Sequence, residues 1–214
     1  EDLPMALHDM IKDTIAAHKR IIFNGNGYSD EWVVEAERRG LPNIKCMVDA
    51  VPALVKPEAV EIFEKHGVYT KAEMESRAEV MYETYSKTIN IEALTMIDMA
   101  KKQIVPATIK YQTSLAESVN AIKAASSAVD TSVQEALMAD ISTNLKDMYA
   151  ALAHLEEVAG KAEAMEEGAE QGHYYHDVVF TAMDELRKPA DKLEMLVAKS
   201  AWPFPSYGDL IFEV

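Results

Sequence analysis

Between residues 70 and 199 the chain is almost free of the residues that interrupt helices. Only Pro106 and Pro189 fall in this stretch, whereas alanine, methionine, glutamate and lysine are frequent. Such a composition favours helix. The stretch is longer than an ordinary single helix, so it must form several helices that pack on one another.

Apolar residues recur here at steps of three or four, which places them along one face of a helix. The first stripe is Met74, Ala78, Met81, Tyr85, Ile89, Ala93, Met96, Ala100 and Ile104. The second is Val133, Leu137, Ile141, Leu145, Met148, Leu152, Leu155, Ala159 and Ala162. The third is Tyr175, Val179, Ala182, Leu186, Leu193 and Val197. Three such stripes bury their faces together most simply in an antiparallel bundle, so the sequence predicts a mostly α fold.

Local signals indicate where the long helices begin and bend. Thr70 and Glu73 form a capping-box pattern, and Ser132 and Glu135 form a second one, so a helix is expected to start at each. Pro106 has no amide hydrogen for the carbonyl four residues earlier, so a kink is expected there. Whether one helix continues beyond Pro106 is left open.

Shorter elements are expected before residue 70. Residues 3–23 have an amphipathic helical pattern that ends in the sequence Asn-Gly-Asn-Gly, a turn signal. Ser29 is placed to cap a short helix that ends at Gly40. Residues 41–56 have an irregular pattern. A further short helix is expected between Pro57 and Gly67.

The charge balance excludes several classes of protein. The chain has 21 Lys and Arg residues against 36 Asp and Glu residues, a net charge of −15. Binding to nucleic acid, which needs clustered basic residues, is therefore not expected. No apolar run reaches the length of a membrane span, so no membrane association is expected. The single cysteine, Cys46, excludes a disulfide framework and fits a reducing, cytoplasmic compartment.

Candidate metal ligands are few. Glu170, His173 and His176 form one Glu-x-x-His step on a helix face, with a second histidine close by. A di-iron bundle needs that step on two helices, together with two further glutamates, and no second copy is present. We interpret these residues as weak metal candidates on a solvated helix face.

The final segment differs from the rest of the chain. Residues 200–214 combine aromatic side chains with prolines and are expected to form an extended aromatic tail. Such a tail must pack either on its own domain or on another surface. The candidate docking residues are Trp202, Phe204, Tyr207 and Phe212.

Three ordered blocks, residues 18–32, 87–96 and 202–210, resemble the C-terminal end of type III glutamine synthetases, the long form of glutamate–ammonia ligase. They read HKRIIFNGNGYSDEW, KTINIEALTM and WPFPSYGDL. The resemblance extends over essentially the whole chain. It implies that residues 1–69 are the closing helices of a catalytic domain, residues 70–199 a helical bundle extension, and residues 200–214 the tail.

The resemblance also implies what the full-length enzyme does. It would form glutamine from glutamate, ammonia and ATP, with Mg or Mn ions neutralising the transferring phosphoryl group. Its subunits would form hexameric rings paired into dodecamers. None of the family's catalytic motifs occurs in this chain, so no catalytic residue, cofactor-binding residue or metal ligand is carried over to it.

Three functions remain to be distinguished. The first is a non-catalytic structural or assembly domain of a type III glutamine synthetase, which contacts the remainder of that chain and neighbouring subunits. The second is an independent helical binding module, whose groove between methionine-rich stripes holds a small ligand or a partner helix. The third is a metal-binding bundle that uses Glu170, His173 and His176.

Overall fold

The computed structural model describes residues 2–205 and 207–212 of the chain, with only the backbone of Tyr207. All regular secondary structure in those residues is helical, so the expected mostly α class is confirmed. The chain divides into two compact units, residues 1–50 and 51–214, which we describe separately. No helix of the described part is both long and apolar enough to cross a membrane.

The first unit begins with α1 (Leu3–His18), which continues as a short 3₁₀ turn over Lys19–Ile21. A loop leads to α2 (Asp30–Arg38), and Gly40 follows with a φ of +72°, a left-handed conformation that glycine adopts without strain. Both helices lie where the sequence predicts them. The predicted cap is wrong in detail, because the Ser29 hydroxyl donates to the carbonyl of Asn26 at 3.0 Å instead of capping α2.

The prediction that residues 41–56 are irregular is wrong over α3 (Met47–Leu54). Pro52 lies inside this helix, where it leaves the carbonyl of Val48 without its usual donor, and this proline obscured the helical pattern. Val48 and Val51, three positions apart, are almost completely buried. Burial of this apolar pair on one helix face offsets the cost of the proline.

The second unit opens with a helix at each predicted position. The first, α4, spans Pro57–Lys65 and is followed by Gly67, whose φ is +64°. The long helix α5 (Lys71–Met99) then starts with the expected capping box. The backbone N–H of Glu73 donates to the Thr70 hydroxyl at 3.3 Å, and the backbone N–H of Thr70 donates to the Glu73 carboxylate at 2.8 Å.

The irregularity expected at Pro106 is a single π turn. It spans Ala100–Ile104 and leads directly into α6 (Val105–Ala125). The amide of Val105 donates to the carbonyl of Ala100, five residues earlier. Widening the helix by one residue in this way accommodates the missing donor of Pro106. The chain therefore stays helical from Lys71 to Ala125.

The return helix α7 (Ser132–Glu163) starts without the predicted second capping box. The Ser132 hydroxyl donates to Asp130 at 3.0 Å, and the Thr131 hydroxyl donates to Glu135 at 2.8 Å. The helix begins one residue earlier than expected because Thr131, rather than Ser132, occupies the N-cap position.

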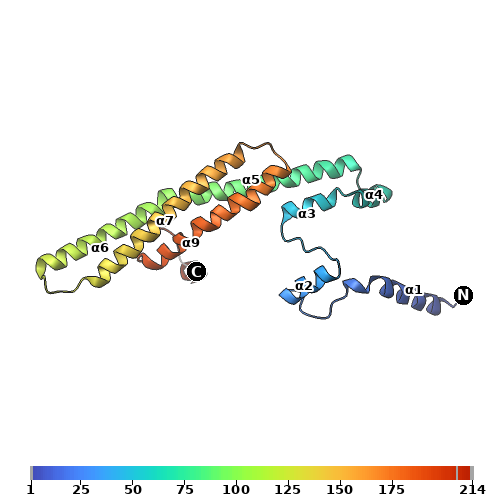
Figure 1. Ribbon diagram of the computed structural model, residues 1–214, viewed down its shortest axis with the longest axis horizontal. Helices are drawn as coiled ribbons and strands as arrows, with labels where there is room; N and C mark the ends of the chain where they lie inside the picture. Colours follow the sequence, from blue (N-terminus) through green and yellow to red (C-terminus); the bar gives the residue numbers. More distant parts are fainter. Residues whose placement is uncertain (1, 206, 213–214) are drawn as a thin grey trace. The chain divides into compact units, whose positions relative to one another are not determined.

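Three further elements complete the bundle. The short α8 (Ala169–Tyr174) continues through a second π turn, Tyr175–Val179, into α9 (Phe180–Leu196). Helices α5 and α6 run in one direction, α7 runs back beside them, and α9 reverses again (Figure 1). The antiparallel bundle is therefore confirmed.

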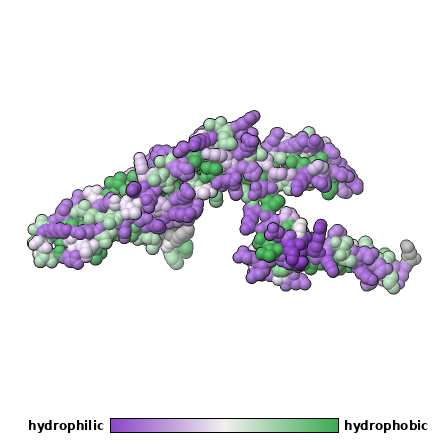
Figure 2. Space-filling model, viewed as in Figure 1, coloured by the Kyte–Doolittle hydropathy of each residue, from purple (hydrophilic) through white to green (hydrophobic). Residues whose placement is uncertain are grey.

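The core of the bundle is built from the three predicted stripes. Its almost fully buried members include Ala93 of α5, Met148 and Leu155 of α7, and Leu186 and Leu193 of α9. All six residues of the third stripe are buried. The first stripe is wrong at Met81, which is exposed while its neighbour Tyr82 is buried. The second stripe is wrong at its first position, because Val133 is 77% exposed beyond the end of the packed region. On the face drawn in Figure 2, hydrophilic residues predominate over the bundle.

The expected extended tail is wrong over its last turns. Residues 207–212 form a short helix, α10 (Tyr207–Phe212), while the chain from Pro203 to Pro205 is non-helical. The aromatic residues Trp202 and Phe204 pack against the bundle core. The side chain of Tyr207 lies outside the described residues.

The register of α7 is tested by two truncations on its predicted stripe. We expect Leu155→Ala, which empties a fully buried site, to lower the free energy of unfolding by about 2–5 kcal/mol. Val133→Ala, at an exposed site, should change it by less than about 0.5 kcal/mol. Urea denaturation followed by circular dichroism measures both, and equal losses would contradict the register.

Candidate functional site: an arginine cluster and apolar surfaces

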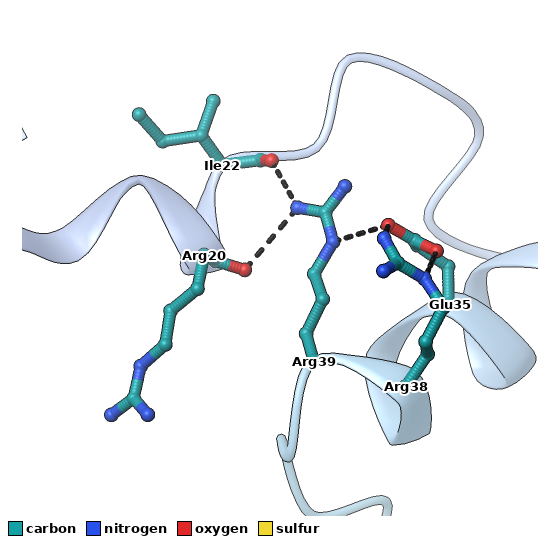
Figure 3. Close-up of polar contacts among 5 residues, drawn as sticks. All are labelled: Arg20, Ile22, Glu35, Arg38 and Arg39. Atoms are coloured by element: carbon teal, nitrogen blue, oxygen red, sulfur yellow. Dashed lines mark hydrogen bonds and ion pairs between the residues drawn. The ribbon is translucent and has the colours of Figure 1, made fainter. Parts of the chain in front are cut away.

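Arg39 joins two segments of the first unit (Figure 3). Its Nη1 atom donates to the backbone carbonyls of Arg20 at 3.2 Å and Ile22 at 2.5 Å, where α1 and its 3₁₀ turn end. Its Nε atom donates to the Glu35 carboxylate at 2.5 Å. Arg38 makes a bidentate pair with the same carboxylate, with both distances 2.6 Å. The guanidinium of Arg39, at the end of α2, therefore donates hydrogen bonds to the free carbonyls where α1 and its 3₁₀ turn end.

Aromatic rings complete this cluster. Phe23 and Trp32 stack with their centroids 4.3 Å apart, and the Arg39 guanidinium lies within 6 Å of both ring centroids. The cation therefore adds an electrostatic attraction to the stacked pair. Together these contacts fix the loop between α1 and α2, where the Asn-Gly-Asn-Gly sequence predicts a turn.

The charge of Glu35 depends on its two arginine partners. Hydrogen bonds from Arg38 and then Arg39 to its carboxylate lower the pKa of Glu35 from 4.5 to about 2. Both arginines stabilise the ionised form, whereas the slight burial of the carboxyl group opposes it. The carboxylate accordingly stays charged at any pH above about 3.

The candidate metal ligands do not converge. His176 pairs with the adjacent Asp177, Nδ1 to Oδ1 at 2.7 Å, and its ring lies 6.5 Å from that of Tyr85. Glu170 is exposed on α8. Within residues 2–205 and 207–212, no group of three or more His, Cys, Asp or Glu side chains is arranged to hold a metal ion. The metal-binding interpretation therefore has no support from the geometry.

The candidate docking residues of the tail separate into two sets. Trp202 and Phe204 are half-buried on the bundle core, with their rings edge-to-face at 6.2 Å. The amide of Trp202 donates to the carbonyl of Ala198 at 3.0 Å, which turns the chain back over the bundle. Phe212, in contrast, is 80% exposed. Of the candidate docking residues whose side chains the structure describes, Phe212 is thus the one left for an external surface.

A cavity of about 790 Å³ opens between α5, α9 and the tail. Its apolar lining includes Met96, Met183, Trp202 and Phe204. The cavity was not predicted as a site, because its walls come from segments separated by about a hundred positions. The methionine-rich stripes were the one sequence signal that pointed to a groove in this region.

The largest set of unpacked apolar side chains lies on α1 and the turn after it. No described residue of α1 is buried, and the apolar residues stand open to solvent among hydrophilic neighbours (Figure 2). The exposed large apolar residues of this segment are Leu3, Met5, Leu7, Met10, Ile11, Ile15, Ile21 and Ile22. Five of these residues, Leu3, Leu7, Met10, Ile11 and Ile15, share one side of α1. An exposed apolar face of this kind is typical of a contact surface.

Sequence comparisons place the chain among known proteins. A family described as "Glutamine synthetase C-terminal domain" matches residues 6–123. The glutamine synthetase of Butyrivibrio fibrisolvens is 37% identical over 214 residues, which are all of this chain and 31% of the relative. The type-3 glutamine synthetase of Dictyostelium discoideum is 29% identical over 97% of this chain and 29% of its own length. A glutamine synthetase of Bacteroides fragilis (strain YCH46) gives the same coverage.

The chain thus spans about three tenths of the length of the curated relatives it matches. Its fold and these matches define a class of helical domain that forms part of a larger enzyme. The chain belongs to the glutamine synthetase C-terminal domain family. The resemblance to type III enzymes noted from the sequence is confirmed by the match with the type-3 relative.

The low pKa of Glu35 sets a pH dependence for the arginine cluster. A carboxyl group whose pKa is lowered on folding contributes stability that is complete above its unfolded value of 4.5 and is lost as the pH falls through about 2. We expect the Glu35 carboxyl ¹³C resonance to titrate well below pH 4.5. Arg38→Gln should raise that midpoint, and Arg39→Gln should raise it less. A midpoint near 4.5 in the unmodified protein would contradict the geometry.

Proposed function

We propose that this chain is the non-catalytic C-terminal structural and assembly domain of a type III glutamine synthetase. The full-length enzyme would make glutamine from glutamate, ammonia and ATP in the cytoplasm, as part of nitrogen metabolism. The observation that carries the proposal is the match of the whole chain to about three tenths of glutamine synthetases, including a type-3 enzyme.

The distribution of buried residues differs between the bundle and residues 3–22, which supports different roles for these two parts of the chain. The bundle has its own apolar core and is built to fold around it. Residues 3–22 have no comparable burial, although eight large apolar side chains lie among them. We propose that this apolar face packs against the remainder of the glutamine synthetase chain, which would hold the bundle to the catalytic part.

ATP and Mg or Mn ions are the cofactors proposed for the full-length enzyme. The residues described here do not fit a metal site, since no cluster of suitable ligands occurs among them. We propose that the phosphoryl-transfer chemistry takes place in the rest of the enzyme.

Assembly is the proposed contribution of the two exposed apolar regions. In hexameric rings paired into dodecamers, α1 would contact its own catalytic part, and the exposed end of α10, including Phe212, would contact that part or a neighbouring subunit. Trp202 and Phe204 already pack their half-buried rings on the core of the bundle. We therefore propose Phe212 as the docking candidate among the tail side chains that the structure describes.

Charged substitutions on the two exposed regions test the proposal in the full-length enzyme. We expect Leu7→Asp to destabilise the enzyme by about 2 kcal/mol or more, because it would place an unpaired carboxylate in an apolar contact. Phe212→Asp should weaken assembly for the same reason. Light scattering after size exclusion, a thermal melt and a glutamine-forming assay measure the three consequences.

Ala16→Asp is the matched control, because Ala16 lies nine positions from Leu7 and so on the opposite side of α1. It adds the same charge to the same helix and should leave assembly unchanged. Normal assembly and stability in both Leu7→Asp and Phe212→Asp would contradict the assembly function. An inactive parent enzyme would contradict the proposed reaction.

A further inference from the structure

The loop between α1 and α2 contains two asparagines that are each followed by glycine, Asn24-Gly25 and Asn26-Gly27. The other asparagines of the chain precede isoleucine, alanine or leucine. All four residues of the loop sequence are exposed. Because glycine has no Cβ to shield its amide, that amide can approach the side chain of the preceding asparagine. The loop thus offers two places at which an asparagine side chain can react with the backbone.

The Asn26 side chain is held by a hydrogen bond. Its Oδ1 atom accepts from the amide of Tyr28 at 3.0 Å. The backbone carbonyl of Asn26 accepts from the amide of Ser29 at 3.2 Å and from the Ser29 hydroxyl at 3.0 Å. These contacts form an Asx-type turn, in which the side chain is directed at the amide two positions later. Reaction with the amide of Gly27 would require the side chain to leave this turn.

Asn24 has no such restraint. Among the residues that the structure describes, neither the Asn24 side chain nor the amide of Gly25 takes part in a hydrogen bond. Gly25 lies against the Phe23 ring, and a Cβ atom at this position would come within 2.4 Å of it. The packing of the loop therefore requires glycine at position 25, directly after an asparagine whose side chain is free to move.

We propose that Asn24 is a site of deamidation, a covalent modification that needs only water as a co-reactant. The backbone nitrogen of Gly25 loses its proton and attacks Cγ of Asn24. A C–N bond forms, the bond between Cγ and Nδ2 breaks, and Nδ2 takes up the proton and leaves as ammonia. Water then opens the resulting succinimide at one of its two carbonyls, which gives aspartate or isoaspartate at position 24.

The modification changes the loop at its contact with the aromatic cluster. Either product adds a negative charge next to Phe23, whose ring centroid lies 5.9 Å from the Arg39 guanidinium. Isoaspartate also adds one methylene group to the backbone between Phe23 and Gly25, which are in contact. The longer backbone must follow a different path over the ring that stacks on Trp32.

Peptide mapping of the full-length protein tests the proposal. Trypsin cleaves after Arg20 and Arg38 and so releases residues 21–38, which contain both asparagines. The protein is incubated above neutral pH and then digested under mildly acidic conditions, which limit further reaction. Mass spectrometry detects the replacement of an amide by an acid and locates it by fragmentation. A synthetic peptide of residues 21–38, incubated in parallel, gives the relative reactivity of the two asparagines without the fold.

We expect the folded protein to deamidate faster at Asn24 than at Asn26. Relative to the ratio in the peptide, the preference should be about fivefold, because the Asn26 side chain must first break a hydrogen bond. The rate at Asn24 should rise with pH, since the attacking amide must lose its proton. Isoaspartyl methyltransferase should label the product at this position.

Gly27→Ala is the matched control. Nothing lies within 4 Å of the position that its methyl group would take, and the φ of Gly27 is not positive, so the fold tolerates alanine there. This variant should slow the reaction at Asn26 and leave the rate at Asn24 unchanged. Asn24→Gln should remove the modification at position 24, because glutamine would have to close a larger ring.

Three results would overturn the proposal. The first is an unmodified Asn24 in the folded protein under conditions in which the synthetic peptide reacts. The second is a ratio of the two rates that equals that of the peptide or favours Asn26. The third is a loss of the Asn24 reaction in Gly27→Ala. A circular dichroism spectrum confirms that each variant retains its helices, so a change in rate is not confused with a loss of fold.

Discussion

The packing of α7 against its neighbours is the contact on which the bundle depends. One face of α7 supplies a continuous row of buried side chains, from Ile141 to Ala162, and both α5 and α9 pack against it. Because α9 packs more extensively on α7 than on α5, removing the apolar face of α7 would leave α9 with only its smaller contact on α5. The helical propensity of these segments alone would not hold them together.

Two π turns interrupt the regular α-helical hydrogen bonding where the helices pack on the core. One precedes Pro106 in the α5–α6 helix, and the other joins α8 to α9 at Tyr175–Val179. A π turn shifts the following helix face by one residue, so side chains on both sides of it can face the same core. Ala100 and Ile104 in the first turn, and Tyr175 and Val179 in the second, are all buried. The irregular turns therefore lie within the core rather than beside it.

The accuracy of the sequence predictions follows the range of the interactions involved. The stripes, apart from Met81 and Val133, depend on residues within a few positions, as do the Thr70 capping box and the helices ended by Gly40 and Gly67, and these features were predicted correctly. The helix around Pro52 was missed, because its stability comes from burial that no local pattern reveals. The start of α7 was displaced by one residue because Thr131, rather than Ser132, occupies the N-cap position.

The candidate sites were less predictable for the same reason. Arg39 reaches carbonyls 17 and 19 positions earlier, and backbone carbonyls leave no signature in a sequence. The cavity is lined by residues of α5, α9 and the tail, an arrangement that only the helix register determines. The aromatic residues of the tail predict that it docks on a surface. They do not tell whether that surface belongs to its own bundle or to another part of the protein. The structure places Trp202 and Phe204 on the bundle and leaves Phe212 exposed.

The central claim is that the bundle is stable through its own core, whereas α1 depends on the rest of a glutamine synthetase. Amide hydrogen exchange, measured on the full-length enzyme and on this 214-residue chain, tests it most directly. The account predicts that α7 and α9 are equally protected in both proteins, and that residues 3–22 are protected only in the full-length enzyme. Equal protection of residues 3–22 in both, or loss of protection in α7 in the shorter chain, would contradict it.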